Sequence, residues 1–200
     1  MTQYSALIIA IASFLLSLYT LWITQLRRGR LQMTQPTMIF MGRESLAGLE
    51  EPPLWPKIYL RTLLFCTADR GCIVENMHLV VHNEYGAYFF DFWAYGEPKI
   101  AKGSGLFVPR NGVALHHHFV LNRRTENFLF VGGDYRIEVF AKIFGHSNLV
   151  KLKEIKVALA GNQSPMMIQV LDAGVFFEWD AASEDYIGRL EKRPKLDRPD

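Results

Sequence analysis

Three consecutive histidines, His116, His117 and His118, are the residues whose type and spacing could best support chemistry. In an extended strand the side chains alternate between two faces, so His116 and His118 share one face. Imidazole is a common metal ligand, but a catalytic zinc needs three protein ligands and an open coordination position. A metal site on this pair therefore requires a third histidine from another strand, such as His78 or His82.

The remaining polar residues give no catalytic signature. His117 alternates with apolar neighbours, which predicts a hydrogen-bonded imidazole in the core. The stretch Lys102-Gly103-Ser104-Gly105 lacks the spacing of a phosphate-binding loop or a nucleophile elbow, and it is typical of a glycine-rich turn. We therefore predict no catalytic residue and no cofactor, and the chain is not expected to be an enzyme.

The segment YGAYFFDFWAYG, residues 85–96, is unusual because both faces of the predicted strand carry large rings. One face has Tyr88, Phe90 and Phe92, and the other has Tyr85, Phe89, Asp91, Trp93 and Tyr95. A half-buried strand in an antiparallel sheet is normally polar on its outer side. Either loops of the same chain or a protein partner must cover the second face, and in the second case Phe89, Trp93 and Tyr95 form an interaction surface.

Cys66 and Cys72 are the only cysteines, and they flank a predicted turn, TADRG. Two cysteines are too few for a disulfide framework or a cysteine-based zinc site. They could approach each other in a hairpin, but a cytoplasmic setting would keep them reduced. We expect free thiols that act as small buried apolar side chains.

The N-terminal segment predicts a transmembrane helix. Residues 1–26 carry no charged side chain, and residues 6–23 are apolar apart from Ser13, Ser17 and Thr20. At ~1.5 Å per residue, such a helix is long enough to cross a hydrocarbon core of about 30 Å. The hydroxyl groups can bond to carbonyl groups of their own helix. A cleaved signal peptide fits less well, because no basic residue precedes the apolar segment.

Charge asymmetry predicts the direction of this helix. Arg27, Arg28 and Arg30 follow it, and such membrane-proximal basic clusters stay on the cytoplasmic side. We therefore expect a single-pass protein of the cell inner membrane with its N-terminus outside and its C-terminal domain in the cytoplasm. The bilayer would contact residues 4–26, and the arginines would face anionic headgroups.

Charge also limits the choice of partners. Beyond residue 30 the chain has 19 basic against 20 acidic residues, a net charge of −1, although the whole chain carries +2. Nucleic acid is therefore not an expected partner. Lys151, Lys153 and Lys156 form a small basic patch that is typical of a solvated or edge strand.

Beyond Arg30, short segments with apolar side chains at alternate positions are separated by Gly, Pro, Asn and Asp, which predicts an all-β domain. Residues 57–66 and 72–83 are expected to form a hairpin, and residues 43–56 a loop interrupted by prolines. Eight or nine strands without helices favour an antiparallel two-sheet sandwich. We expect an anchor at residues 1–30, the sandwich at 31–190, and a disordered polar tail at 191–200.

The segment GGDYRIEVFAKIFG resembles the late strand of immunoglobulin-like and fibronectin-like domains, in which a tyrosine at the start of the strand folds back onto the corner. Tyr135 would be that residue. The resemblance implies an immunoglobulin-like sandwich and no particular ligand. The anchor followed by RGRLQMTQPTMIF also resembles bacterial single-pass membrane proteins, and this resemblance implies no activity.

Two classes of function remain. The anchor and the lack of catalytic spacing favour a protein-interaction or assembly module of a bacterial membrane complex, with a protein partner or a second copy of the chain. The alternative is a metal-dependent enzyme, or a sensor of a metal or small ligand, that uses His116 and His118. A sensor for a small ligand would leave no local motif in a β domain.

Overall fold

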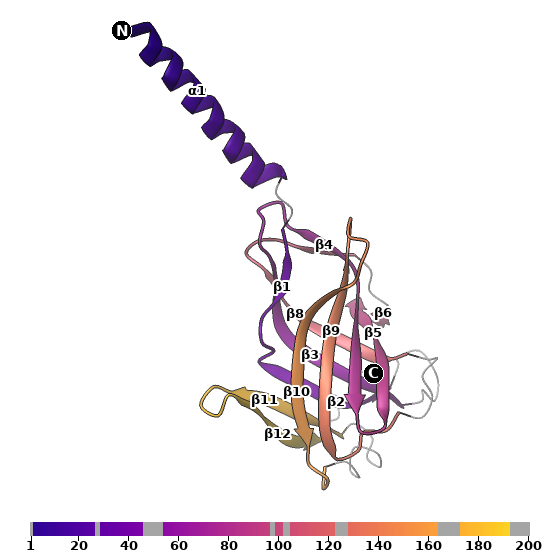
Figure 1. The fold of residues 1–200 in the computed structure, drawn as a ribbon. Helices are drawn as coiled ribbons and strands as arrows, with labels where there is room; N and C mark the ends of the chain where they lie inside the picture. The colour runs from indigo at the N-terminus through magenta and orange to yellow at the C-terminus, as the bar shows by residue number, and fades with distance from the viewer. Residues whose placement is uncertain are drawn as a thin grey trace, which may run out of the picture.

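The fold consists of one N-terminal helix followed by a β domain (Figure 1). The computed structural model describes residues 2–26, 29–45, 54–96, 99–101, 105–122, 128–163 and 173–192. The predicted tail therefore lies largely outside the described residues. Only its first two residues, 191 and 192, are described, and they belong to the last strand.

The helix α1 (Thr2–Leu21) continues into a π-helical turn, η1 (Trp22–Leu26). Residues Tyr4–Thr24 are long and apolar enough to cross a membrane, as either an anchor or a signal sequence. The hydroxyl groups of Ser17, Thr20 and Thr24 donate to carbonyl oxygens four residues earlier, at 2.9, 2.7 and 2.8 Å. These bonds satisfy the polar side chains within the helix, as predicted for Ser17 and Thr20.

Twelve strands follow in the described residues, and all their pairings are antiparallel. They are β1 (Leu31–Met33), β2 (Met38–Ser45), β3 (Leu54–Cys66), β4 (Cys72–Asn83), β5 (Gly86–Gly96), β6 (Lys99–Ala101), β7 (Leu106–Val108), β8 (Val113–Leu121), β9 (Gly133–Ile143), β10 (Val150–Leu159), β11 (Ala173–Asp180) and β12 (Asp185–Lys192).

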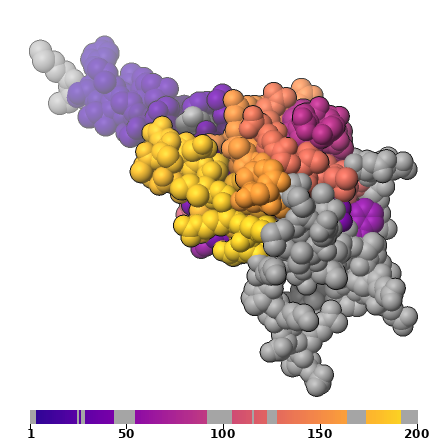
Figure 2. All heavy atoms as spheres, turned by 90° about the horizontal axis from the view of Figure 1, so that it is seen from below, coloured from indigo at the N-terminus to yellow at the C-terminus, as the bar shows by residue number. Residues whose placement is uncertain are grey.

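These strands form one continuous sheet in the order β10-β9-β4-β5-β8-β3-β2-β11-β12. The short strands β1, β6 and β7 pair with β3, β5 and β4, respectively. The sheet curves until β1 and β12 both lie close to β10, so the domain is nearly barrel-like. Figure 2 shows β11 and β12, in yellow, beside β10, in orange. The all-β prediction is confirmed, whereas the division into two packed sheets is not.

The predicted hairpin of residues 57–66 and 72–83 is wrong. Both strands exist as β3 and β4, but β3 pairs with β1, β2 and β8, while β4 pairs with β5, β7 and β9. The turn between them is a corner at which the chain leaves one part of the curved sheet for another. Alternation of side chains along a strand does not reveal which strand lies beside it.

The predicted proline loop is also shorter than expected. β2 extends to Ser45 and β3 begins at Leu54, so Pro56 lies within a strand, opposite Arg43. This position is near the start of β3, where a missing N–H group disturbs the ladder least. Residues 46–53 are outside the described part of the chain.

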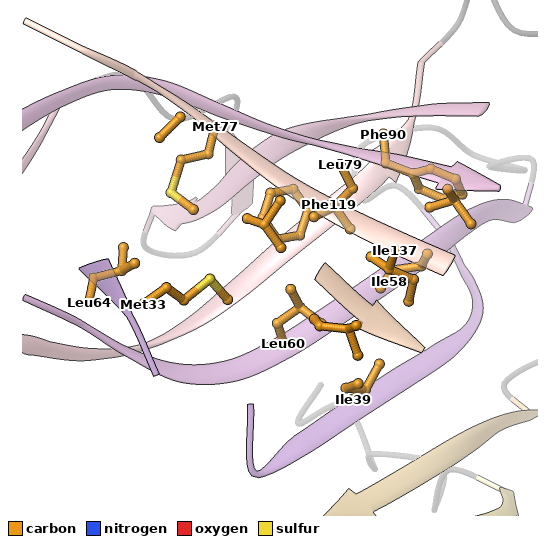
Figure 3. Packing of buried hydrophobic residues seen from close by; sticks show 14 of the residues in the cluster. Met33, Ile39, Ile58, Leu60, Leu64, Met77, Leu79, Phe90, Phe119 and Ile137 are labelled. Atoms are coloured by element: carbon orange, nitrogen blue, oxygen red, sulfur yellow. The ribbon is translucent and has the colours of Figure 1, made fainter. Parts of the chain in front are cut away.

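The core lies inside the curved sheet and is formed by alternate residues of the long strands. Figure 3 shows Leu60 of β3, Phe119 of β8 and Ile137 of β9 among the side chains that meet there. Along β9, buried positions recur at every second residue from Tyr135 to Ile143. This confirms the period-two pattern from which the strand was predicted.

Tyr135 packs in this core and folds back onto the preceding loop. Its hydroxyl oxygen accepts from the backbone N–H of Val131 and donates to the carbonyl of the same residue, both at 2.8 Å. The local prediction from the resemblance is confirmed. Phe128 and Phe130, in the segment before β9, are also buried and pack edge-on against each other, with ring centroids 4.9 Å apart.

Candidate functional site

The aromatic strand β5 presents different side chains to its two faces. Phe90 is fully buried, whereas its neighbour Phe89 is 51% exposed on the outer face. Tyr88 packs edge-on against Phe128, with ring centroids 4.8 Å apart. The structure places the backbone of Trp93 and Tyr95 in β5, but their side chains are outside its description. The predicted interaction surface is therefore visible only at Phe89.

Polar groups border Phe89 on the outer face. In the ladders, Phe89 lies opposite Val80 of β4, and Val80 lies opposite Glu138 of β9. The Glu138 carboxylate accepts from Lys151 Nζ at 2.6 Å and contacts His82 Nε2 at 3.1 Å. The hydrogen bond from Lys151 is the main reason why the pKa of Glu138 is lowered. The outer face thus combines an exposed ring with an ion-pair network.

His116 and His118 lie on the same side of β8, as predicted, and both contact Tyr59 of β3. The Tyr59 ring stacks on His116 and tilts against His118, with centroids 5.3 and 4.9 Å away. The Tyr59 hydroxyl is hydrogen-bonded to His116 Nδ1. Burial raises the pKa of Tyr59.

A metal site on this pair would need a third ligand. Within the described ranges, no group of three or more His, Cys, Asp or Glu side chains is placed to hold a metal ion. His78 instead stacks on Phe140 at 5.4 Å, and His82 belongs to the network around Glu138. The structure therefore assigns both proposed third histidines to other contacts.

His117 is a core residue. Its side chain is fully buried beside the ladder partner Leu60, in agreement with the predicted alternation. Burial, with a smaller contribution from His116, lowers the pKa of His117 to about 4. The imidazole is thus neutral at neutral pH, when a charge would be costly in this environment.

Cys66 and Cys72 form a disulfide at the corner between β3 and β4, so the prediction of free thiols is wrong. The turn brings their Cα atoms to 5.7 Å, which is a usual separation for a bridge. The sequence indicated their proximity, but the assumed reducing compartment led to the opposite conclusion. Disulfides persist mainly in oxidising compartments.

The chain leaving the helix is attached to the same corner. Arg30 donates its backbone N–H to Thr67 Oγ1 at 2.8 Å, and the backbone N–H of Thr67 donates to the Arg30 carbonyl at 3.0 Å. A Cβ on Gly29 would lie 2.3 Å from Cys66 Sγ, so only glycine allows this approach. Arg30 is exposed, as expected for the basic cluster, while Arg27 and Arg28 are outside the described residues.

Beside this attachment lies an apolar hollow that the sequence did not reveal. It has a volume of about 270 Å³ and is lined by the exposed side chains of Ile73, Phe107 and Phe144, together with Gly29 and Arg70. Its residues come from segments far apart in the sequence. The only feature of the sequence that could have indicated this hollow is an apolar residue at an outward position of a strand, such as Ile73.

No protein-family model matches this chain, and no curated protein matches its sequence at a significant level.

Proposed function

We propose that this protein is a membrane-anchored β domain that acts as a protein-interaction or assembly module of a bacterial membrane complex. The observation that carries this proposal is the half-exposed ring of Phe89 on a strand whose next residue is fully buried. An exposed aromatic side chain on a rigid strand is a common anchor of protein interfaces. The predicted partners are another protein or a second copy of the chain.

The ionisable groups support a structural module more than an active site. His117 is neutral in the core, Glu138 is held by Lys151, and Tyr59 bonds to His116. His117 packs in the core, and each of the other two contacts joins side chains of neighbouring strands. None of them combines a nucleophile, a base and a group that orients the base, the arrangement that covalent catalysis requires.

The location we propose is the inner membrane, with the β domain in the cytoplasm. Arg27, Arg28 and Arg30 follow the helix in the sequence, and a basic cluster at this position favours the cytoplasmic side. The disulfide between Cys66 and Cys72 favours the opposite side, because cytoplasmic thiols are kept reduced. The test places a new cysteine at the exposed position Lys156 in a Cys66→Ala/Cys72→Ala background, because Cys66 and Cys72 are themselves buried. A membrane-impermeant thiol reagent applied to intact cells should leave this cysteine unlabelled, and labelling would place the domain outside.

Photocrosslinking tests the interaction proposal directly. A p-benzoylphenylalanine replacing Phe89 in the full chain, expressed in its own cells, should form a specific protein adduct. The matched control is the same replacement at Ile187 of β12, a similarly exposed apolar residue on another strand. Equal adduct patterns at both positions, or no protein adduct at Phe89, would contradict an interface on β5.

The alternative function, a metal-dependent enzyme or a metal or small-ligand sensor, is supported by the shared side of His116 and His118. Its test is elemental analysis of the purified protein, with the His116→Ala/His118→Ala variant as control. Stoichiometric metal that disappears in the variant would favour this alternative over the interaction module.

A further inference from the structure

Three exposed apolar side chains lie together at the end of the domain nearest the helix. Ile73 of β4 and Phe107 of β7 are ladder partners and are 47% and 57% exposed. Phe144, in the turn between β9 and β10, is 66% exposed and donates its backbone N–H to the Ile73 carbonyl at 2.9 Å. We call these three residues the apolar tip.

The apolar tip is part of a preformed surface. Gly71 has a φ of 72°, and a Cβ there would lie 2.7 Å from the Phe107 ring, so the turn fits closely beneath this ring. Lys142 Nζ donates to the carbonyls of His146 and Ser147 at 2.6 and 2.7 Å. These bonds hold the β9–β10 turn that carries Phe144.

The distance from the helix determines where this surface lies relative to a bilayer. Gly29 lines the same hollow as the apolar tip and follows Leu26, the last residue of η1, by three residues. At ~3.5 Å per residue, Gly29 lies at most about 10 Å from Leu26. The headgroup layer on each side of a bilayer is about 5–8 Å thick. If the helix spans a membrane, the hollow therefore lies at the membrane surface.

The charges next to the apolar tip fit the same environment. Arg30 and Arg70 are exposed, and Arg70 lines the hollow. Arg110 is also exposed, but its charge is balanced by Asp69, at 2.6 Å. Aromatic rings favour the headgroup region, and arginines near it are attracted to anionic lipids.

We propose that Ile73, Phe107 and Phe144 insert into the headgroup layer of the bilayer spanned by α1, so that the β domain sits on the membrane in a fixed orientation. This inference rests on the membrane anchor in the proposed function. Phe89 then points to the side of the domain, because Val80, its ladder partner, is seven residues along β4 from Ile73, or about 24 Å. Figure 1 shows β4 beginning at the helix end of the domain and running away from it.

The test is photocrosslinking of the full chain in vesicles of phosphatidylethanolamine and phosphatidylglycerol. A p-benzoylphenylalanine replaces Phe107, Phe144, Phe89 or Leu15, one position at a time, and lipid adducts are counted by mass spectrometry. Phe89 is the matched control, an exposed phenylalanine far from the helix, and Leu15 reports whether α1 lies in the bilayer. We expect several-fold more lipid adducts at Phe107 and Phe144 than at Phe89.

The outcomes separate this proposal from the proposed function. Lipid adducts at Leu15 but no excess at Phe107 and Phe144 over Phe89 would overturn the insertion while leaving the anchor intact. No lipid adducts at Leu15 would instead contradict the anchor itself. Protein adducts at Phe107 and Phe144 would assign the apolar tip to a second copy of the chain, which also overturns insertion.

A second measurement tests the charge contribution. Arg70→Gln should lower the yield of lipid adducts at Phe107 in vesicles with phosphatidylglycerol and leave it unchanged in vesicles of phosphatidylcholine alone. The control is Arg110→Gln, because Arg110 is already paired with Asp69. An equal loss for both variants would contradict the role of Arg70.

Discussion

Tyr135 and Val131 are joined by two hydrogen bonds through one hydroxyl group, which accepts from the Val131 N–H and donates to its carbonyl. The tyrosine ring is buried in the core, so this pair fixes the loop before β9 to the interior. Burial is also the main reason why the pKa of Tyr135 is raised.

Tyr135→Phe should therefore destabilise the domain. The substitution keeps the ring and leaves two backbone groups of Val131 without their partner, which typically costs about 1–3 kcal/mol. Thermal unfolding of the full chain in detergent micelles measures the loss. The control is Tyr85→Phe, since Tyr85 is exposed and its hydroxyl should contribute less than about 0.5 kcal/mol. Equal melting temperatures for both variants would contradict the role of this corner.

The two faces of β5 predict opposite effects of truncation. Phe90→Ala removes a fully buried ring and should cost about 3–5 kcal/mol. Phe89→Ala removes a half-exposed ring and should cost less than about 1 kcal/mol while weakening association with the partner. Chemical unfolding of both variants, with crosslinking in cells, measures the two effects.

Trp93 can be tested in the same way as Phe89, because side chains alternate along a strand and Trp93 therefore lies on the same face of β5 as Phe89. If it belongs to the interaction surface, Trp93→Ala should abolish association and leave the melting temperature nearly unchanged. A loss of stability as large as that of Phe90→Ala would mean that Trp93 is covered by the domain itself, and the interface would lose a central residue.

The sequence predicted the features that depend on local alternation. The strand positions of β5, β8, β9 and β10, the buried side of His117 and the corner at Tyr135 all follow from residues close together in the chain. β10 is also a terminal strand of the sheet order, as its three lysines indicated.

The features that the sequence did not predict depend on pairing between distant segments. Nothing in the sequence indicates that β4 pairs with β7 and β9 instead of with β3. The hairpin of β3 and β4 was therefore predicted wrongly. The apolar tip was missed for the same reason, because Ile73, Phe107 and Phe144 meet only after these strands pair. Pairing of this kind is decided by the packing of the whole core.

The disulfide predicts a stability that depends on redox conditions. The bridge closes a loop of about seven residues, which in the chain-entropy description contributes about 2 kcal/mol. Cys66→Ala/Cys72→Ala should lose this amount under oxidising conditions, as measured by chemical unfolding. A reducing agent should destabilise the wild type to a similar extent and leave the variant unchanged. A reductant effect that persists in the variant would rule out the bridge as its source.

His117 predicts how stability depends on pH. Its pKa is about 4 in the folded chain, because burial disfavours the charged imidazole, and about 6.5 in the unfolded chain. Between these values the unfolded chain binds a proton that the folded chain does not, so the free energy of unfolding decreases as the pH falls. Above pH ~6.5 the His117 imidazole is neutral in both states and does not lower the free energy of unfolding. Between pH ~6.5 and ~5 this free energy should decrease by about 2 kcal/mol.

The variant His117→Leu isolates this contribution, since leucine has no titratable group and suits an apolar site. Its free energy of unfolding should change much less than that of the wild type over the same interval. Carboxylates with a lowered pKa, such as Glu138 and Asp180, lose their stabilising effect only below their unfolded values near pH 4.5 and 3.8, so they contribute little in this interval. Urea unfolding at several pH values gives the two curves. Parallel curves for wild type and His117→Leu would show that another group titrates, and the buried neutral imidazole would then not explain the acid sensitivity of the domain.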